Sequence, residues 1–175
     1  RVIDFDNPEA NRFLAVRELT VVGLRAPNYR RRADLVCFVN GLPLVFFELK
    51  AIHRNVRTGF DKNLRDYKDS HSICHVFHHN AFLVVSNGVV ARYGSITSEW
   101  EHFAEWKRDD ESDKGSVDAE VLLRGMMNKA RLLDVVENFI LFDTSKPEMR
   151  KVVARNQQVL GVNRAVEAVR RQESI

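Results

Sequence analysis

The segment from residue 34 to residue 50, DLVCFVNGLPLVFFELK, places the strongest constraint on the fold of this chain. It contains two apolar runs on either side of Asn40-Gly41, and Asn-Gly in that position is the strongest short-range signal for a β-hairpin. The second run is apolar enough for a buried strand, yet Glu48 and Lys50 interrupt it near its end. Charged side chains are rarely buried without partners, because desolvation is costly. The two charges therefore need an explanation.

Other strands are predicted around this hairpin. Residues 12–22 alternate imperfectly between apolar and polar and predict a strand. A second Asn-Gly pair, Asn87-Gly88, joins the apolar runs 81–86 and 89–95 and predicts a second hairpin. The first part of the chain should therefore be rich in β-structure.

Helical periodicity marks three further segments. Residues 58–71 carry apolar side chains at i, i+4 and i+7, which predicts an amphipathic helix. Residues 119–142 carry one apolar stripe and predict a long helix. A capping-box pattern with proline in the first turn, residues 145–148, predicts another helix that runs to residue 172, with a kink or break at Gly161.

The bulk composition fits a folded, soluble domain. The chain has 175 residues, of which 45% are hydrophobic and 29% charged, and its net charge of +3 permits nucleic-acid binding without arguing strongly for it. It has no apolar run near 18 residues, so we expect no membrane span. Cys37 and Cys74 lie in apolar surroundings without CxxC spacing; we expect two small buried side chains and a cytoplasmic location.

The two charges in the first hairpin suggest a metal site. Strand side chains alternate between faces, so Glu48 and Lys50 share one face. If the hairpin places Asp34 opposite or diagonal to Glu48, the Cβ atoms lie roughly 5 to 8 Å apart. Two carboxylates at that spacing repel each other unless a cation such as Mg²⁺ lies between them. An equally weighted alternative is that Glu48 and Lys50 mark where the strand emerges into solvent.

The residues around these charges resemble a known family. The segment RRADLVCFVNGLPLVFFELKA (31–51) is similar to the nuclease segment of type I restriction enzyme R subunits. Further similar blocks follow in the expected order: NLRDYK, LVVSNGVVARYGS, WEHFAEWK, LLDVVENFILFD and ARNQQVLGVNRAVEAV. The resemblance extends from about Asn7 to Arg170.

The resemblance implies an α/β fold of the PD-(D/E)xK type, a central mixed sheet flanked by helices, followed by a C-terminal helical segment. It implies an endonuclease core at residues 1–108, a hinge at 109–118 and a helical lead-in to a helicase-like motor at 119–175. On the same basis the enzyme would hydrolyse double-stranded DNA with Mg²⁺, or Mn²⁺ as a substitute. Its partners would be modification and specificity subunits, and the full-length subunit would use ATP.

The family's functional residues map onto this chain one by one. Asp34 and Glu48 would be catalytic metal ligands and Lys50 the catalytic lysine. Asn63 and Tyr67, one helical turn apart, would face the site or the DNA backbone; a helix with a half-buried tyrosine is an equally weighted alternative. Apart from the resemblance, Arg31 and Arg32, which together with Arg30 precede Asp34, would lie near the proposed metal and hold DNA phosphates; a solvated loop charge is an equally weighted alternative.

Three departures from the family pattern stand out. Ala33 replaces the usual proline, and Asn63 replaces the usual glutamine with a shorter amide, which puts the role of that helix in doubt. A helix that normally precedes the first strand and often bears an acidic residue is not recognisable.

Gln158 falls where the motor carries an adenine-recognising glutamine, yet no phosphate-binding loop occurs in these residues. An amphipathic helix without its partner domain is the simpler interpretation of that segment.

The sequence therefore predicts the nuclease domain of a type I restriction enzyme R subunit. One competing interpretation is a non-catalytic DNA-holding or subunit-docking module that retains the fold. Another is a repair or mobile-element nuclease of the same fold. The presence of Asp34, Glu48 and Lys50 argues against the first, and the FVNGLPLV block argues against the second.

Overall fold

A mixed five-stranded sheet forms the centre of the structure. The computed structural model describes residues 2–24, 28–69, 72–109 and 119–173. The strands lie side by side in chain order: β1 (Phe13–Val22), β2 (Arg30–Val39), β3 (Leu42–Leu49), β4 (Phe82–Ser86) and β5 (Ala91–Gly94). Only the β3–β4 pair is parallel; the other neighbours are antiparallel. A short 3-10 turn, η1 (Pro8–Ala10), precedes the sheet. The mixed sheet expected from the family resemblance is confirmed.

Both predicted Asn-Gly turns are present. Asn40 and Gly41 have φ of 49° and 86°, the left-handed pair that a tight two-residue hairpin requires. Gly88 also has φ of 86°, and the Asn87 side chain accepts the amide of Val90 at 2.9 Å. The strand predicted over 12–22 is confirmed as β1. Strand β2 begins at Arg30, several residues before the predicted hairpin run.

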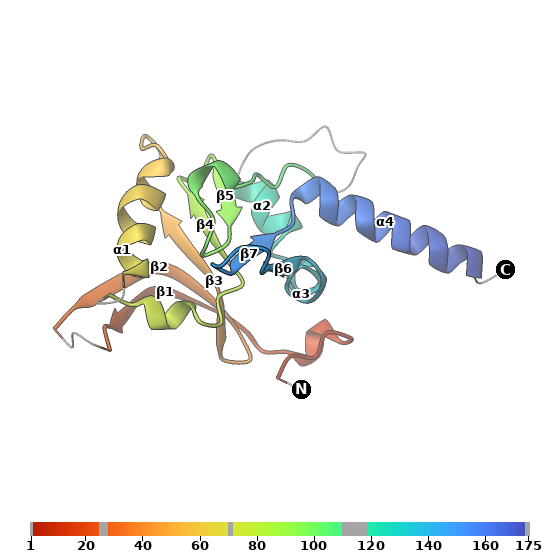
Figure 1. Cartoon of the computed structure of the whole chain (residues 1–175), viewed down its shortest axis with the longest axis horizontal. Coiled ribbons are helices and arrows are strands. Elements are labelled where there is room, and N and C mark those ends of the chain that lie inside the picture. The colour runs from red at the N-terminus through yellow and green to blue at the C-terminus, as the bar shows by residue number, and fades with distance from the viewer. Residues whose placement is uncertain (1, 25–27, 70–71, 110–118, 174–175) are drawn as a thin grey trace.

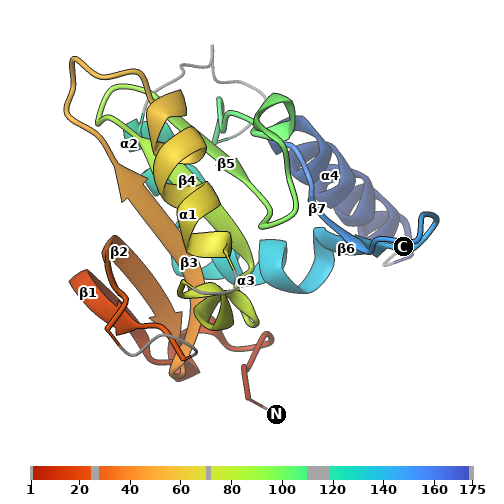
Figure 2. The same ribbon diagram turned by 60° about the vertical axis from the view of Figure 1, so that its left-hand side comes forward.

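Helices cover both faces of the sheet (Figure 2). The connection between the parallel strands crosses one face and contains η2 (Gly59–Leu64), α1 (Arg65–Lys68) and the 3-10 turn η3 (Cys74–Phe77). We call this side the α1 face; its buried side chains include Phe46, Phe60, Leu64, Leu83 and Val85. On the other side pack α2 (Ala119–Gly125) and α3 (Lys129–Asn138). This α2–α3 face includes Val45, Phe47, Val84, Leu122 and Leu132.

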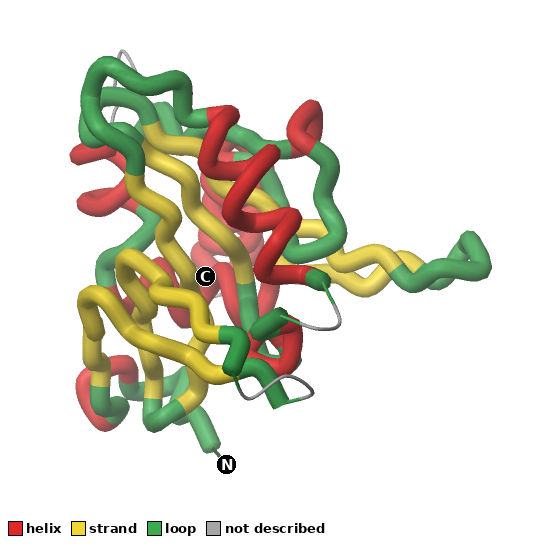
Figure 3. The backbone as a smooth tube through the Cα atoms, turned by 90° about the vertical axis from the view of Figure 1, so that its left-hand side faces the viewer, coloured by secondary structure: helices red, strands yellow, loops and turns green. Residues whose placement is uncertain are grey.

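The helix predicted over 58–71 is confirmed in its central part. It crosses the sheet in front of the strands (Figure 3). Its first six residues, Gly59–Leu64, form a π-helical turn rather than an α-helix, and regular α-helix follows only to Lys68. Residues 70–71 at its predicted end lie outside the described part of the chain. Single π-helical turns are rare and occur frequently at functional sites.

The single helix predicted over 119–142 is wrong. It is divided into α2 and α3, and Asn128 gives the reason. The Asn128 side chain accepts the amide of Arg131 at 2.9 Å as the N-cap of α3, and it donates to the Gly125 carbonyl at 2.8 Å. One side chain thus closes α2 and begins α3, because asparagine competes for backbone partners at helix ends. The apolar stripe continued through the break and concealed it.

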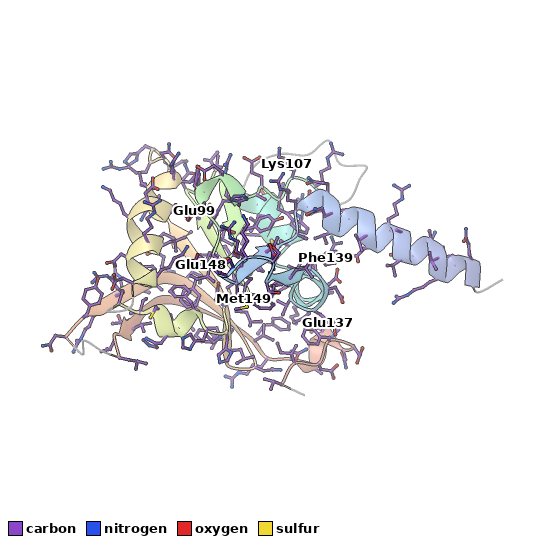
Figure 4. The ribbon with its side chains drawn as sticks, viewed as in Figure 1. Glu99, Lys107, Glu137, Phe139, Glu148 and Met149 are labelled. Atoms are coloured by element: carbon purple, nitrogen blue, oxygen red, sulfur yellow. The ribbon has the colours of Figure 1, made fainter. Side chains whose placement is uncertain are left out.

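Residues 140–153 form a hairpin rather than helix, which is a second correction. Strands β6 (Ile140–Asp143) and β7 (Arg150–Val153) pair antiparallel. The predicted capping box at 145–148 is part of the connecting loop, where Glu148 and Met149 are labelled in Figure 4. The hairpin is joined to the main sheet at Lys151, whose amide donates to Thr97 at 2.9 Å and whose carbonyl accepts Ser95 at 2.5 Å.

The last helix, α4 (Asn156–Glu173), begins well after the predicted opening at residues 145–148, nine residues beyond Pro147, and runs without a break. Gly161 lies inside this continuous helix, so the predicted break there is wrong, and open space surrounds the position that a Cβ would take. Asn156 is buried, and its side chain accepts the amides of Lys107 and Arg108. Beyond this anchor the helix projects away from the sheet (Figure 1).

The predictions for the hinge, the two cysteines and a membrane span have different outcomes. The predicted hinge at 109–118 lies, apart from Asp109, outside the described residues, and the proposed domain division stays a prediction. Cys37 and Cys74 are free thiols, but both are half-buried rather than fully buried; burial raises the pKa of Cys37 to about 11. Among the described helices, none has the length and apolar character to cross a membrane.

Candidate active site

Glu48 is a carboxylate inside the core. It lies on β3 with 1% of its surface exposed, between apolar strand residues. One carboxylate oxygen, Oε1, accepts the Lys50 ammonium at 2.6 Å and also the Asn63 side-chain amide. The other oxygen, Oε2, is buried without a hydrogen-bond partner. The solvent-emergence interpretation therefore does not hold for Glu48, because its charge is held in the interior by specific donors.

The environment works against ionisation of Glu48. Burial raises the pKa of the Glu48 carboxyl above its ordinary value of 4.5, and the nearby Asp34 carboxylate raises it further. Lys50 and Tyr67 act in the opposite direction. A raised carboxyl pKa beside a specific cation is typical of functional sites, although structural ion pairs produce it too.

Asp34 lies on the adjacent strand β2 and reaches the end of β3. Its Oδ2 accepts the backbone amide of Leu49 at 2.7 Å. The β2–β3 register pairs Leu35 with Phe47, so Asp34 lies one step along from that pair, beside Glu48. The structure thus brings together the two carboxylates that the sequence singled out, and half-buried Lys50 lies with them.

The helix that crosses the α1 face completes the cluster. Asn63 donates to Glu48, so the shorter amide does reach the carboxylate despite replacing the family's glutamine. Tyr67 is buried, and its hydroxyl donates to the Arg32 carbonyl at 3.2 Å. Burial and the nearby Glu48 raise the Tyr67 pKa. Both residues predicted on this helix therefore line the carboxylate site.

Sequence reasoning missed Gly59 at the start of this helix. A Cβ built on Gly59 would lie 3.1 Å from Glu48 Cγ and 3.3 Å from Lys50 Cε. A side chain at this position would require Glu48 and Lys50 to shift by a few tenths of an ångström, so glycine allows the helix backbone to lie close to the charged pair. The chain contains eight glycines, and the sequence alone offers no signal that separates this one from the others.

The predicted arginines have different surroundings. Arg31 pairs with Asp66 of α1, and its guanidinium lies over the Tyr29 ring at 3.7 Å. The pKa of Asp66 is lowered mainly by this arginine. Arg32 is exposed, with Glu18 at 3.6 Å as an equally exposed partner. Arg31 therefore joins β2 to the helix, whereas Arg32 is exposed to solvent beside Glu18.

The residues present fit a hard divalent cation. Glu48 offers a buried oxygen without a hydrogen-bond partner, and Asp34 lies beside it. Mg²⁺ is usually held by one or two protein carboxylates, with water and phosphate oxygens completing its shell. In the described part of the chain, no three His, Cys, Asp or Glu side chains are grouped to hold a metal by themselves. A two-carboxylate site completed by the substrate is the arrangement that these residues permit.

Comparison with known proteins agrees with this geometry. Residues 1–102 match the family model described as Type I restriction enzyme R protein N terminus. The chain belongs to this family. The matched region contains all five strands of the central sheet and the side chains that surround Glu48.

Individual members of the R-protein family match most of the chain. It is 37% identical over 177 residues to the Type I restriction enzyme HindI endonuclease subunit of Haemophilus influenzae, covering 96% of this chain. It is 30% identical over 188 residues to the Putative type I restriction enzyme MjaIXP endonuclease subunit of Methanocaldococcus jannaschii, covering 95%. The chain spans 16% and 17% of the lengths of these two relatives.

Gln158 lies apart from this cluster, in the first turn of α4. Its side chain is exposed, and its oxygen accepts the backbone amide of Arg155 at 2.7 Å. This is the reciprocal half of a capping box, in which a glutamine three residues into a helix reaches back to the cap. In this structure Gln158 stabilises the start of a helix, and its role towards adenine stays a prediction for the longer protein.

Proposed function

We propose that this chain is the nuclease part of a type I restriction enzyme R subunit and hydrolyses DNA phosphodiester bonds with Mg²⁺. The observation that carries the proposal is Glu48: a fully buried carboxylate with two donors on one oxygen and none on the other, beside a second carboxylate. A core strand gains nothing in stability from this arrangement, because burying a charge costs more than an apolar side chain of similar size.

Each side chain has a defined part in the proposed reaction. Asp34 and Glu48 would hold Mg²⁺, which when bound offsets charge on the phosphate and lowers the pKa of water. Lys50 favours the ionised form of Glu48 against the effect of burial, and because it occupies Oε1 at 2.6 Å it leaves Oε2 for the metal. The Lys50 ammonium is also placed to neutralise charge that develops on a phosphate oxygen. Asn63 fixes Glu48 from the helix side.

DNA would approach from the solvent side of β2. Arg30 and Arg32 are exposed there and can hold phosphates, whereas Arg31 is already engaged with Asp66. The intact subunit would act on double-stranded DNA in the cytoplasm, together with modification and specificity subunits. ATP would be bound and hydrolysed by parts of the longer protein. Gln158 of this chain would contribute to adenine binding only together with those parts.

A metal titration tests the proposal. The melting temperature of this chain should rise with Mg²⁺ or Mn²⁺, because a ligand that binds only the folded state stabilises it. The Glu48→Gln variant, which keeps the shape of the side chain, should show no such rise. Glu101→Ala, which removes an exposed carboxylate elsewhere, is the matched control and should respond as wild type does. An equal response of wild type and Glu48→Gln would refute the metal site.

A second measurement separates catalysis from folding. In the intact R subunit, Lys50→Ala should abolish DNA cleavage and leave ATP hydrolysis unchanged. Loss of both activities would give Lys50 a folding role instead. Retention of cleavage would favour the non-catalytic alternative for this site.

A further inference from the structure

Glu18 has the most unusual backbone conformation in β1. Its φ is 52°, in the left-handed region that residues other than glycine, asparagine and aspartate rarely adopt. All ten residues of β1 are described, and Glu18 is the only one with positive φ. Such outliers cost free energy and persist where the surrounding structure imposes them, often beside functional sites.

Glu18 lies directly opposite Asp34 on the neighbouring strand β2. The β1–β2 ladder pairs Arg17 with Leu35 and Leu19 with Ala33, and between these pairs Glu18 and Asp34 do not pair. The register is the same on both sides of the gap, so no residue has been inserted. The ladder is interrupted at one position in each strand, and that position in β2 is the candidate metal ligand.

The side-chain alternation of β2 reverses at this gap. Val36 and Phe38 pack on the α1 face, and Leu35 and Cys37 pack on the α2–α3 face, as regular alternation requires. Continued alternation would turn Ala33 to the α2–α3 face. Ala33 instead packs on the α1 face. Asp34 is therefore the residue at which the alternation of β2 side chains between the two faces of the sheet reverses.

Strand β1 reverses its alternation in the same way. Phe13 packs on the α2–α3 face, whereas Leu19 and Val21, which the same alternation would place there, pack on the α1 face. Glu18 lies between them. A single left-handed residue rotates the following side chains relative to the preceding ones, which is how local irregularities re-aim strands next to active sites.

The reversal has two consequences at the site. It turns Arg31 towards Asp66 and brings the Arg32 carbonyl to the Tyr67 hydroxyl, which fixes this end of β2 to the helix. It also leaves Asp34 outside the regular ladder, where its carboxylate reaches the Leu49 amide beside Glu48. The Leu49 amide lies beyond the last β2–β3 pair at this end of the ladder, Leu35 with Phe47.

We propose that the left-handed backbone of Glu18 positions Asp34 for the nuclease site, so that Glu18 is a positioning residue that acts through its conformation. The inference rests on the proposed function. The Glu18 carboxylate is not the active feature, because 62% of its side chain is exposed and its ion-pair partner Arg32, at 3.6 Å, is exposed to a similar extent. Exposed pairs of this kind contribute little.

A series of substitutions at one position separates backbone from side chain. Glycine and asparagine tolerate positive φ, whereas β-branched valine does not. Glu18→Gly and Glu18→Asn should therefore keep DNA cleavage by the intact R subunit, and Glu18→Gly should melt no lower than wild type. Glu18→Val should lower cleavage by about 100-fold, the scale expected for misplacing a reacting group by an ångström. ATP hydrolysis should be unchanged in all three.

Hydrogen exchange of the Leu49 amide reports the position of Asp34 without metal or DNA. The Leu49 amide should exchange with solvent about tenfold faster in Glu18→Val than in wild type, and as fast as in Asp34→Ala, because both variants lose its acceptor. Glu18→Gly should keep wild-type protection. Arg17→Val is the control, since Arg17 is exposed and regularly paired in the same strand, and it should leave cleavage and exchange unchanged.

The outcomes distinguish this inference from the proposed function. Wild-type cleavage and Leu49 protection in Glu18→Val would overturn the positioning role. Loss of cleavage in Glu18→Gly and Glu18→Asn would also overturn it, because the carboxylate would then be the active feature. Full cleavage by Asp34→Ala would overturn the proposed function itself, whatever the Glu18 series shows.

Discussion

Replacement of Lys50 by methionine should destabilise this protein in a strongly pH-dependent way. Methionine keeps the length of the side chain and removes the ammonium from Glu48, whose side chain is 2% exposed. Removing one partner of a buried pair costs about 3–5 kcal/mol. Because the Lys50 side chain is itself 20% exposed, we expect the lower end of that range, about 3 kcal/mol, at pH 8.

The pH dependence follows from the raised pKa of Glu48. A carboxyl whose folded-state pKa lies above its unfolded value of 4.5 stabilises the protein fully below pH 4.5, and this contribution is lost as the pH rises through the folded-state pKa. In Lys50→Met the folded-state pKa rises further, while the unfolded value is unchanged. The variant should therefore continue to lose stability relative to wild type, by about 1.4 kcal/mol per pH unit, until its own folded-state pKa is passed.

Urea unfolding from pH 5 to pH 8, with EDTA present so that no metal competes, measures this difference. The free-energy cost of Lys50→Met should be small at pH 5, where Glu48 can take up a proton, and about 3 kcal/mol at pH 8. The groups facing Glu48 are Lys50, Asn63, Tyr67 and Asp34, and only the first is replaced. The same substitution in a Glu48→Gln background should show no pH dependence. An equal cost at both pH values would refute the reasoning.

Three further outcomes can be measured with the same chain. Gly59→Ala should reduce cleavage by the intact subunit several-fold, because the added methyl group would lie 3.1 Å from Glu48 and 3.3 Å from Lys50. Gly161→Ala is the control, because nothing lies within 4 Å of its added methyl group. It should leave cleavage unchanged and stabilise the chain by about 0.5–1 kcal/mol. Asn128→Ala should lower the free energy of unfolding by about 1 kcal/mol, since the cap of α3 is lost; no loss in urea unfolding would contradict the explanation of the α2–α3 break. Leu132→Ala should cost about 2–5 kcal/mol in the same assay, because this side chain is 3% exposed and packs in one cluster with the sheet; a cost under about 1 kcal/mol would mean that α3 folds separately.

The candidate site could be predicted in outline because its parts are encoded locally. The Asn-Gly turn makes β2 and β3 neighbours, so the order Asp34, Glu48, Lys50 already indicates two carboxylates and an amine near one strand end. A register shift between Cys37 and Phe38, which the sequence does not signal, then sets Asp34 beside Glu48. The family resemblance singles out Asn63 and Tyr67, and helical spacing places them on one face of the next segment. The roles of these side chains in catalysis stay predictions.

The elements after residue 119 show where local patterns fail. An apolar stripe with helical spacing runs through α2, α3 and into β6, and periodicity cannot register the capping by Asn128 that divides it. Residues 150–153 become a strand because β6 and the hydroxyl groups of Ser95 and Thr97 supply partners for their backbone. Ser95 and Thr97 are more than 50 residues away in the chain, so no local window contains both of these partners.

The sequence by itself determined which residues are available for the site and the turn that brings most of them together, because an Asn-Gly hairpin and a helical repeat are local properties of the chain. Tertiary structure alone decided the environment that gives those residues their chemistry. The burial of Glu48, the close approach of the helix at Gly59 and the left-handed conformation of Glu18 opposite Asp34 depend on strands and helices packed from distant segments. Desolvation and backbone strain arise only when those segments meet, and for that reason they cannot be read from the order of the residues.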